Sequence, residues 1–237
     1  MVDNREYKRG LIPAWGLSLY IELHVKNNVH CFLMDCSGSE ATWIHNAYKL
    51  GIDPQRIEAI FISHWHSDHA GALPCILELI GRKRTPIYAP PEPSIPTVAI
   101  ERRGGVLIPC DSPKEIFPEV YTTGTVYRRV PEHSLIVHVP GKGLVIFVGC
   151  SHPGIENILY RSMQITGVHK VYAVIGGFHI SSRSKGYELG VLFRKLGLVY
   201  VSPMHCTSDE AREAIRSVIP EAFIDNGVGR ILVINKT

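Results

Sequence analysis

The sequence lacks an apolar run long enough to cross a membrane, and it lacks closely spaced cysteine pairs. No hydrophobic segment reaches the ~18 residues of a transmembrane helix. The first residues are polar, so we expect neither a membrane span nor a secretion signal. The six cysteines are scattered and form no C-x-x-C pair. This spacing argues against a disulfide framework and favours a cytoplasmic location.

Strong charge is also missing. Charged residues make up 20% of the chain and the formal net charge is +3, which is too small by itself to imply a nucleic-acid partner. Hydrophobic residues make up 45%, which excludes a disordered chain. Because no low-complexity linker interrupts the 237 residues, we predict one domain over residues 1–237 with a substantial core.

The sequence does contain a dense group of metal-ligand residues. His64, His66, Asp68 and His69 form the pattern H-x-H-x-D-H, between an expected strand at 56–63 and an expected helix from about residue 71. Strand side chains repeat every two residues, so His64 and His66 can point the same way. Imidazole and carboxylate suit zinc, with manganese or iron(II) as alternatives. The alternative is a polar loop that happens to be rich in histidine.

Strand and helix signals occur in both halves of the chain. Helices are expected at 39–50, 71–80, 154–166, 186–196 and 208–217. Paired strands are expected at 17–25 with 30–35 and at 134–139 with 144–149. Further strands are expected at 86–89, 106–108, 119–123, 170–175, 198–202 and 229–235. The proline-rich segment 90–96 is predicted to be a loop. The pattern favours two sheets with helices on their outer faces.

Other candidate site residues follow strands. His152 lies in a Gly-Cys-Ser-His-Pro-Gly turn, where glycine and proline fix a tight bend, so it is predicted to be a ligand. His179 ends a Gly-Gly-Phe-His segment, whose glycines suggest a close approach of the backbone. For His179 itself a ligand, a proton shuttle, a substrate contact and a structural role all stay open. Cys150 is either a thiolate ligand or a buried bystander. Asp35 either orients a histidine ligand or serves as a turn residue.

The pattern at 64–69 resembles the signature of the metallo-β-lactamase fold superfamily. The chain resembles one branch of this superfamily in more detail. That branch is the archaeal 7,8-dihydropterin-6-methyl-4-(β-D-ribofuranosyl)aminobenzene 5'-phosphate synthase-like proteins, which are linked to methanopterin synthesis. The matching segments are residues 14–18, 50–53, 149–155, 176–179 and 203–207. The resemblance implies an α/β fold, a four-layer αββα sandwich. It also implies a metal-dependent hydrolase or transferase acting on a phosphorylated small molecule, with neither nucleic acid nor membrane as a partner.

The same resemblance implies one or two divalent ions, zinc before manganese or iron. His64, His66 and His152 would hold one ion, and Asp68, His69 and His205 the other. Many members carry a bridging Asp where this chain has Cys150, so occupancy by a single ion stays open. Asp68 would also orient the attacking water. Catalytic zinc keeps one position open beside three protein ligands, so we predict that His179 acts as a proton donor.

Basic clusters occur at 82–84, 102–103 and 128–129. Most such clusters are solvated faces, but arginine binds phosphate well in bidentate geometry, so one of them is a candidate phosphate contact. The alternative to an enzyme is a non-catalytic metal- or ligand-binding protein on the same fold.

Overall fold

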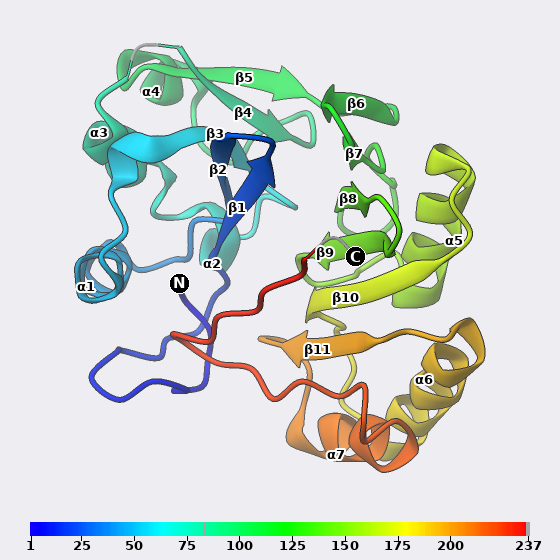
Figure 1. The fold of residues 1–237 in the computed structure, drawn as a ribbon. Helices are drawn as coiled ribbons and strands as arrows, with labels where there is room; N and C mark the ends of the chain where they lie inside the picture. Colours follow the sequence, from blue (N-terminus) through cyan, green and yellow to red (C-terminus); the bar gives the residue numbers. More distant parts are fainter. Residues whose placement is uncertain (83, 236–237) are drawn as a thin grey trace. The chain divides into compact units, whose positions relative to one another are not determined.

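The computed structural model describes residues 1–82 and 84–235, so Lys83 of the basic cluster at 82–84 lies outside the described residues. The chain forms two compact units. Unit 1 comprises Met1–Asp111 and Gly227–Arg230, and unit 2 comprises Ser112–Asn226 and the residues from Ile231 onward. Each unit contains one β-sheet and its own helices (Figure 1). The expected single domain over residues 1–237 stays a prediction.

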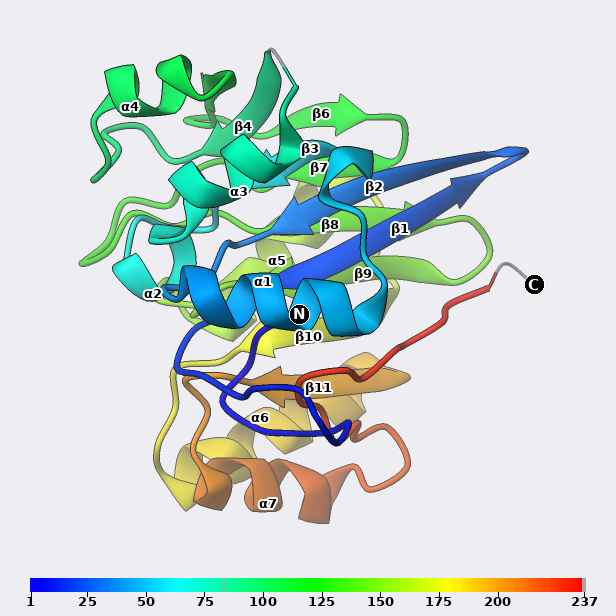
Figure 2. The same ribbon diagram turned by 90° about the vertical axis from the view of Figure 1, so that its left-hand side faces the viewer.

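The sheet of unit 1 has five strands in sequence order. They are β1 (Leu19–Val25), β2 (Asn28–Met34), β3 (Ile57–Phe61), β4 (Thr85–Ala89) and β5 (Gly105–Pro109). The first two form the expected antiparallel hairpin (Figure 2), and the remaining pairs are parallel. Because parallel strands end at the same edge of a sheet, the residues after β2 and β3 meet there.

The helices of unit 1 are α1 (Glu40–Leu50), the short η1 (Pro54–Arg56), α2 (Ser67–Ala70), α3 (Leu73–Ile80) and α4 (Thr97–Arg102). Helix α1 begins and ends as predicted, because Ser39 accepts a hydrogen bond from Thr42 N and Gly51 closes the helix with φ 68°. Trp43 of α1, Ile60 of β3 and Leu77 of α3 belong to one buried core. These helices therefore pack against the sheet.

The sheet of unit 2 has six strands in the order β11-β10-β9-β8-β7-β6. Their bounds are β6 (Lys114–Phe117), β7 (Val120–Thr122), β8 (Leu135–Val139), β9 (Gly143–Val148), β10 (Val171–Gly177) and β11 (Tyr200–Met204). Strands β9, β10 and β11 are parallel, and β8 and β9 form the predicted hairpin. The parallel strands β9, β10 and β11 therefore end at one edge.

Three helices complete unit 2, namely α5 (Ile155–Thr166), α6 (Arg183–Leu196) and α7 (Asp209–Val218). Leu159, Phe193 and Ile215 from these helices are buried in one core with strand residues such as Val174. The predicted strand at 229–235 was wrong, because this described segment forms no strand. Instead, Val228 makes an isolated bridge to Glu6 within unit 1.

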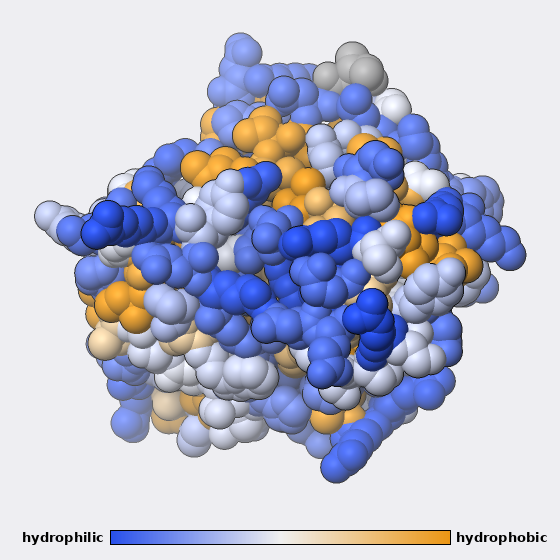
Figure 3. Space-filling model, turned by 90° about the horizontal axis from the view of Figure 1, so that it is seen from below, coloured by the Kyte–Doolittle hydropathy of each residue, from blue (hydrophilic) through white to orange (hydrophobic). Residues whose placement is uncertain are grey.

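No helix among the described residues is long and apolar enough to cross a bilayer. On the face shown in Figure 3, apolar side chains form separate patches between polar ones. Scattered exposed apolar residues are normal on protein surfaces and call for no special partner.

Candidate metal centre

The predicted ligands of unit 1 gather at the ends of β2 and β3. The rings of His64 and His66 have centroids 4.6 Å apart, and those of His64 and His69 are 4.1 Å apart. His69 Nε2 also lies 3.9 Å from Asp68 Oδ2. His64 and His69 are fully buried, whereas His66 is exposed. The motif therefore brings three imidazoles and one carboxylate together.

Asp35 fixes this cluster through hydrogen bonds to His69 and Ser63. Its Oδ2 lies 2.7 Å from His69 Nδ1, and its carboxylate also accepts hydrogen bonds from the backbone N–H and hydroxyl of Ser63. The Ser63 hydroxyl lies 3.0 Å from His64 Nδ1. A partner on Nδ1 fixes the ring and directs Nε2 toward a metal ion. The structure therefore favours the orienting role of Asp35 over a simple turn role.

The donor set fits a divalent cation. His64 Nε2 and His66 Nδ1 face each other at 3.1 Å, and two nitrogen lone pairs at that distance need a proton or a cation between them. Two nitrogens bound to one tetrahedral zinc at ~2.0–2.1 Å stand roughly 3.3 Å apart. The separation is that of a hydrogen bond between the two rings and is also close to that of two ligands on one ion, and the ligand types suit a metal site.

In unit 2, the loop after β9 is held by a buried carboxylate that sequence reasoning did not single out. Glu132 Oε1 accepts hydrogen bonds from the backbone N–H groups of Cys150 and Ser151, and Oε2 accepts one from His152. Glu132 is 1% exposed. Three consecutive backbone donors on one carboxylate fix the direction in which the side chains of this loop leave the backbone. The lone acidic residue before β8 carried no sequence signal for this role.

Close packing brings the ends of β10 and β11 to this loop. A Cβ on Gly177 would meet Gly149 O at 2.5 Å and Cys206 Sγ at 2.6 Å. Only glycine fits there without a shift. This confirms the close backbone approach suggested by the Gly176-Gly177 pair. It places His179 beside His152, with ring centroids 4.5 Å apart.

Two cysteines join His179 in unit 2. One ligand atom each from Cys150, His179 and Cys206 lie within 4.8 Å of one another. A hydrogen bond with Cys206 raises the pKa of His179. Hydrogen bonds with Cys150 and His179 lower the pKa of Cys206 to about 5, against the opposing effect of burial. Imidazole and thiolate are ligands for soft or borderline ions. Cys206, directly after His205, is a candidate that sequence reasoning missed.

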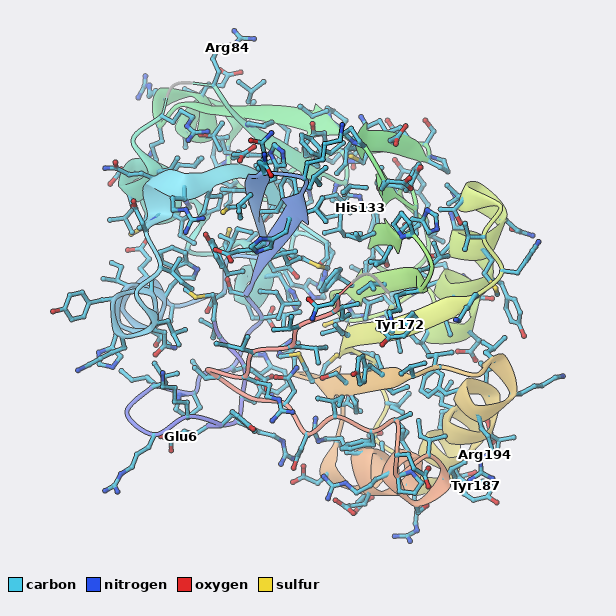
Figure 4. All side chains as sticks on the ribbon, viewed as in Figure 1. Glu6, Arg84, His133, Tyr172, Tyr187 and Arg194 are labelled. Atoms are coloured by element: carbon cyan, nitrogen blue, oxygen red, sulfur yellow. The ribbon has the colours of Figure 1, made fainter. Side chains whose placement is uncertain are left out.

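Two other histidines of unit 2 are buried. His205 is 6% exposed and follows β11, as expected. His133, labelled in Figure 4, lies just before β8, and its Nδ1 is 2.7 Å from Thr122 Oγ1.

Comparisons with known proteins agree with the resemblance described from the sequence. Residues 25–92 match the family model of the metallo-beta-lactamase superfamily. The chain is also 29% identical, over 93% of its length and 91% of the relative, to 7,8-dihydropterin-6-methyl-4-(beta-D-ribofuranosyl)-aminobenzene-5'-phosphate synthase from Methanocaldococcus jannaschii. The chain is thus similar to the metallo-β-lactamase superfamily in part of its sequence and to a curated synthase over most of its length. The resemblance to this superfamily and to its synthase branch is confirmed.

Solved structures of this superfamily share the fold. A metal-dependent hydrolase of the β-lactamase superfamily aligns with a TM-score of 0.79 and 24% identity, covering 99% of this chain and 97% of its own. The fold protein YhfI from Bacillus subtilis aligns with a TM-score of 0.63 and 13% identity, over 93% of each chain. The predicted α/β fold of metallo-β-lactamase type is confirmed. A fold of this type implies divalent metal binding.

Proposed function

We propose that this protein is a metal-dependent hydrolase or transferase of the metallo-β-lactamase superfamily, acting on a phosphorylated small molecule in pterin or methanopterin metabolism. The observation that carries the proposal is the cluster of His64, His66, Asp68 and His69 with Asp35 behind it. The synthase relative supports the substrate class and the pathway.

Each side chain has a separate task in this proposal. His64, His66, Asp68 and His69 would serve as ligands of divalent metal, with the rings of His64 and His69 held by Ser63 and Asp35. Asp68 would also orient the attacking water. When bound, the ion polarises a reacting oxygen and acidifies water. His152 and His205 are proposed as further ligands. The division of all six ligands between two ions stays a prediction.

His179 is proposed to donate a proton to the leaving group. It is exposed at the end of β10, so a substrate can reach it. Its nearness to His152 and Cys206 also allows a ligand role, and metal analysis of a His179 variant distinguishes the two.

The test begins with protein purified without added metal. Elemental analysis should find one to two equivalents of transition metal per chain, most of it lost in His66→Ala and retained in the control His24→Ala, which changes an exposed histidine of β1. Turnover on a panel of phosphoesters, lactones and thioesters should disappear with chelator and return with zinc, manganese or iron(II).

Two results would contradict the proposal. Unchanged metal content in His66→Ala would remove the motif as a metal site. Turnover confined to β-lactams or thioesters would exclude a phosphorylated substrate. Metal binding without turnover on any substrate would instead favour the non-catalytic alternative.

A further inference from the structure

Unit 2 contains a polar pocket beside the loop that carries Cys150 and His152. Its volume is about 370 Å³, within the range of small-molecule sites. One wall comes from the segment between β7 and β8, and the other from the start of α5. The polar groups that matter here are Arg128, Glu132, Ser134, Asn157, Arg161 and Gln164.

Positive charge in the pocket is not neutralised by ion pairs. Within residues 1–82 and 84–235, neither Arg128 nor Arg161 pairs with a carboxylate. Arg161 Nε donates to Thr123 O at 2.7 Å, which holds the guanidinium while its two terminal nitrogens stay available. The lining carboxylate, Glu132, is engaged by three backbone N–H groups of the neighbouring loop. The pocket therefore suits an anion.

Ser134 gives an independent indication of a ligand. The residue is 1% exposed and lines the pocket. Its backbone N–H donates to Thr123 Oγ1, but its own hydroxyl has no hydrogen-bond partner among the described residues. A buried hydroxyl without a partner is costly. A polar group bound in the pocket would satisfy it.

We propose that this pocket binds the phosphate group of the substrate, an inference that rests on the proposed function for the identity of that substrate. Arg128 and Arg161 supply the charge-assisted hydrogen bonds that phosphate prefers. Ser134, Asn157 and Gln164 supply neutral donors. Of the basic clusters in the sequence, the one at 128–129 then contributes the phosphate contact.

The location of the pocket indicates what role a bound phosphate would have. Pro153 and Glu132 line the pocket. Pro153 directly follows His152, and Glu132 accepts a hydrogen bond from the backbone N–H of His152. A phosphate bound there leaves the rest of the substrate to extend toward the His152 loop. The phosphate thus serves for recognition, and the bond that reacts lies elsewhere in the substrate.

Calorimetric titration of the metal-loaded protein tests this inference. The probes are inorganic phosphate and ribose 5-phosphate, with ribose as the uncharged control. Arg128→Gln should weaken binding of both phosphates roughly tenfold or more, since a hydrogen bond to a charged group contributes more than a neutral one. Lys195→Gln removes an exposed positive charge of α6 and should leave binding unchanged.

Ser134→Ala separates a ligand contact from a structural one. Because the hydroxyl has no hydrogen-bond partner among the described residues, this variant should be at least as stable as the parent without phosphate and still bind phosphate more weakly. Where turnover is measurable, Arg128→Gln should raise KM for the phosphorylated substrate and leave kcat nearly unchanged.

The outcomes for this inference and for the proposed function are distinct. In one outcome, phosphate binding is unaffected by Arg128→Gln and Ser134→Ala, yet lost in His66→Ala. This result would place phosphate on the metal ion and contradict the proposal that the pocket binds it. Pocket-dependent phosphate binding without turnover on any substrate would support the pocket and count against the proposed enzyme.

Discussion

Several residues in or next to the candidate sites have backbone conformations that are uncommon outside glycine. Asp35, Ser151, His179 and His205 have φ values of 58°, 61°, 47° and 47°. Each directly follows, or lies within three residues of, the end of a strand. A left-handed conformation in a residue with a side chain carries strain that surrounding contacts must hold. Here it turns the chain sharply, so that side chains from successive strand ends are directed toward the candidate site of their own unit.

The proposed proton-donor role of His179 gives the first prediction. His179→Ala should keep the parent's metal content, because the predicted ligand set does not include His179. Turnover should fall by ~10²–10⁴, the usual contribution of a general acid. Metal analysis and steady-state kinetics on the same preparation provide the measurement. Loss of one equivalent of metal would make His179 a ligand.

Glu132 gives a second prediction. Glu132→Gln replaces a carboxylate that accepts three backbone hydrogen bonds with an amide that has one acceptor oxygen and one donor nitrogen. The variant should lose about 1.5–3 kcal/mol of unfolding free energy, the contribution of a hydrogen bond to a charged group, as measured by urea denaturation. Glu221→Gln, at an exposed position, is the matched control. Equal stability of the two variants would mean that the carboxylate does not hold the loop.

Sequence reasoning found most candidate ligands at the residue scale but not the groups that hold them. His64, His66, Asp68 and His69 form a local pattern and could be read directly. Glu132 lies 18 to 20 residues from its three partners, and one acidic residue at that distance carries no periodic or motif signal. The left-handed conformations also fall on residue types that sequence rules do not mark.

At the scale of elements, α5 and α6 of unit 2 are joined by an ion pair. Lys185 Nζ lies 2.9 Å from Glu156 Oε1. Burial alone would raise the pKa of Glu156, but its backbone hydrogen bond and Lys185 together lower it below the usual 4.5. A carboxyl group whose pKa is lowered in the folded state stabilises the fold at pH values above its unfolded pKa. This stabilisation is lost as the pH falls through the folded pKa.

Lys185→Met should therefore lower the free energy of unfolding only slightly, and only above acidic pH. Both side chains are about a third or more exposed, so the loss at pH 7 should be roughly 0.2–1 kcal/mol. The difference from the parent should shrink below pH 4.5. Urea denaturation across pH 3–7, with Lys195→Met as control, measures it. A loss that stays constant down to pH 3 would rule out the ion pair as its source.

The prediction of helices and strands from the sequence succeeded where nearby residues determine the boundaries of an element. The cap residues Ser39 and Gly51 bound α1, and the hairpin of β8 and β9 follows from two apolar runs joined by a short turn. It failed at 229–235, where Ile231 and Val233 suggest a strand yet are 76% and 66% exposed. A strand needs a neighbour to pair with, and that depends on the whole fold. Helix α4 was missed because the prolines before it indicated a loop.

At the scale of the whole molecule, a bound ion should raise thermal stability, because a ligand that binds only the folded state stabilises it by mass action. The melting temperature should rise when zinc is added to chelator-treated protein and fall again with chelator. In His66→Ala the rise should be absent or much smaller, whereas His24→Ala should behave like the parent. An equal rise in His66→Ala would show that the ion stabilises the protein through other residues.

Residues 227–230 belong to unit 1, although all of 112–226 separates them from the rest of that unit. Tyr7 and Lys8 donate backbone hydrogen bonds to Val228 O, and Val228 N donates to Arg5 O. During translation, a ribosome therefore delivers the partners of the amino-terminal segment only after unit 2 has been synthesised. A fragment cut at residue 111 would leave Arg5, Tyr7 and Lys8 without these bonds.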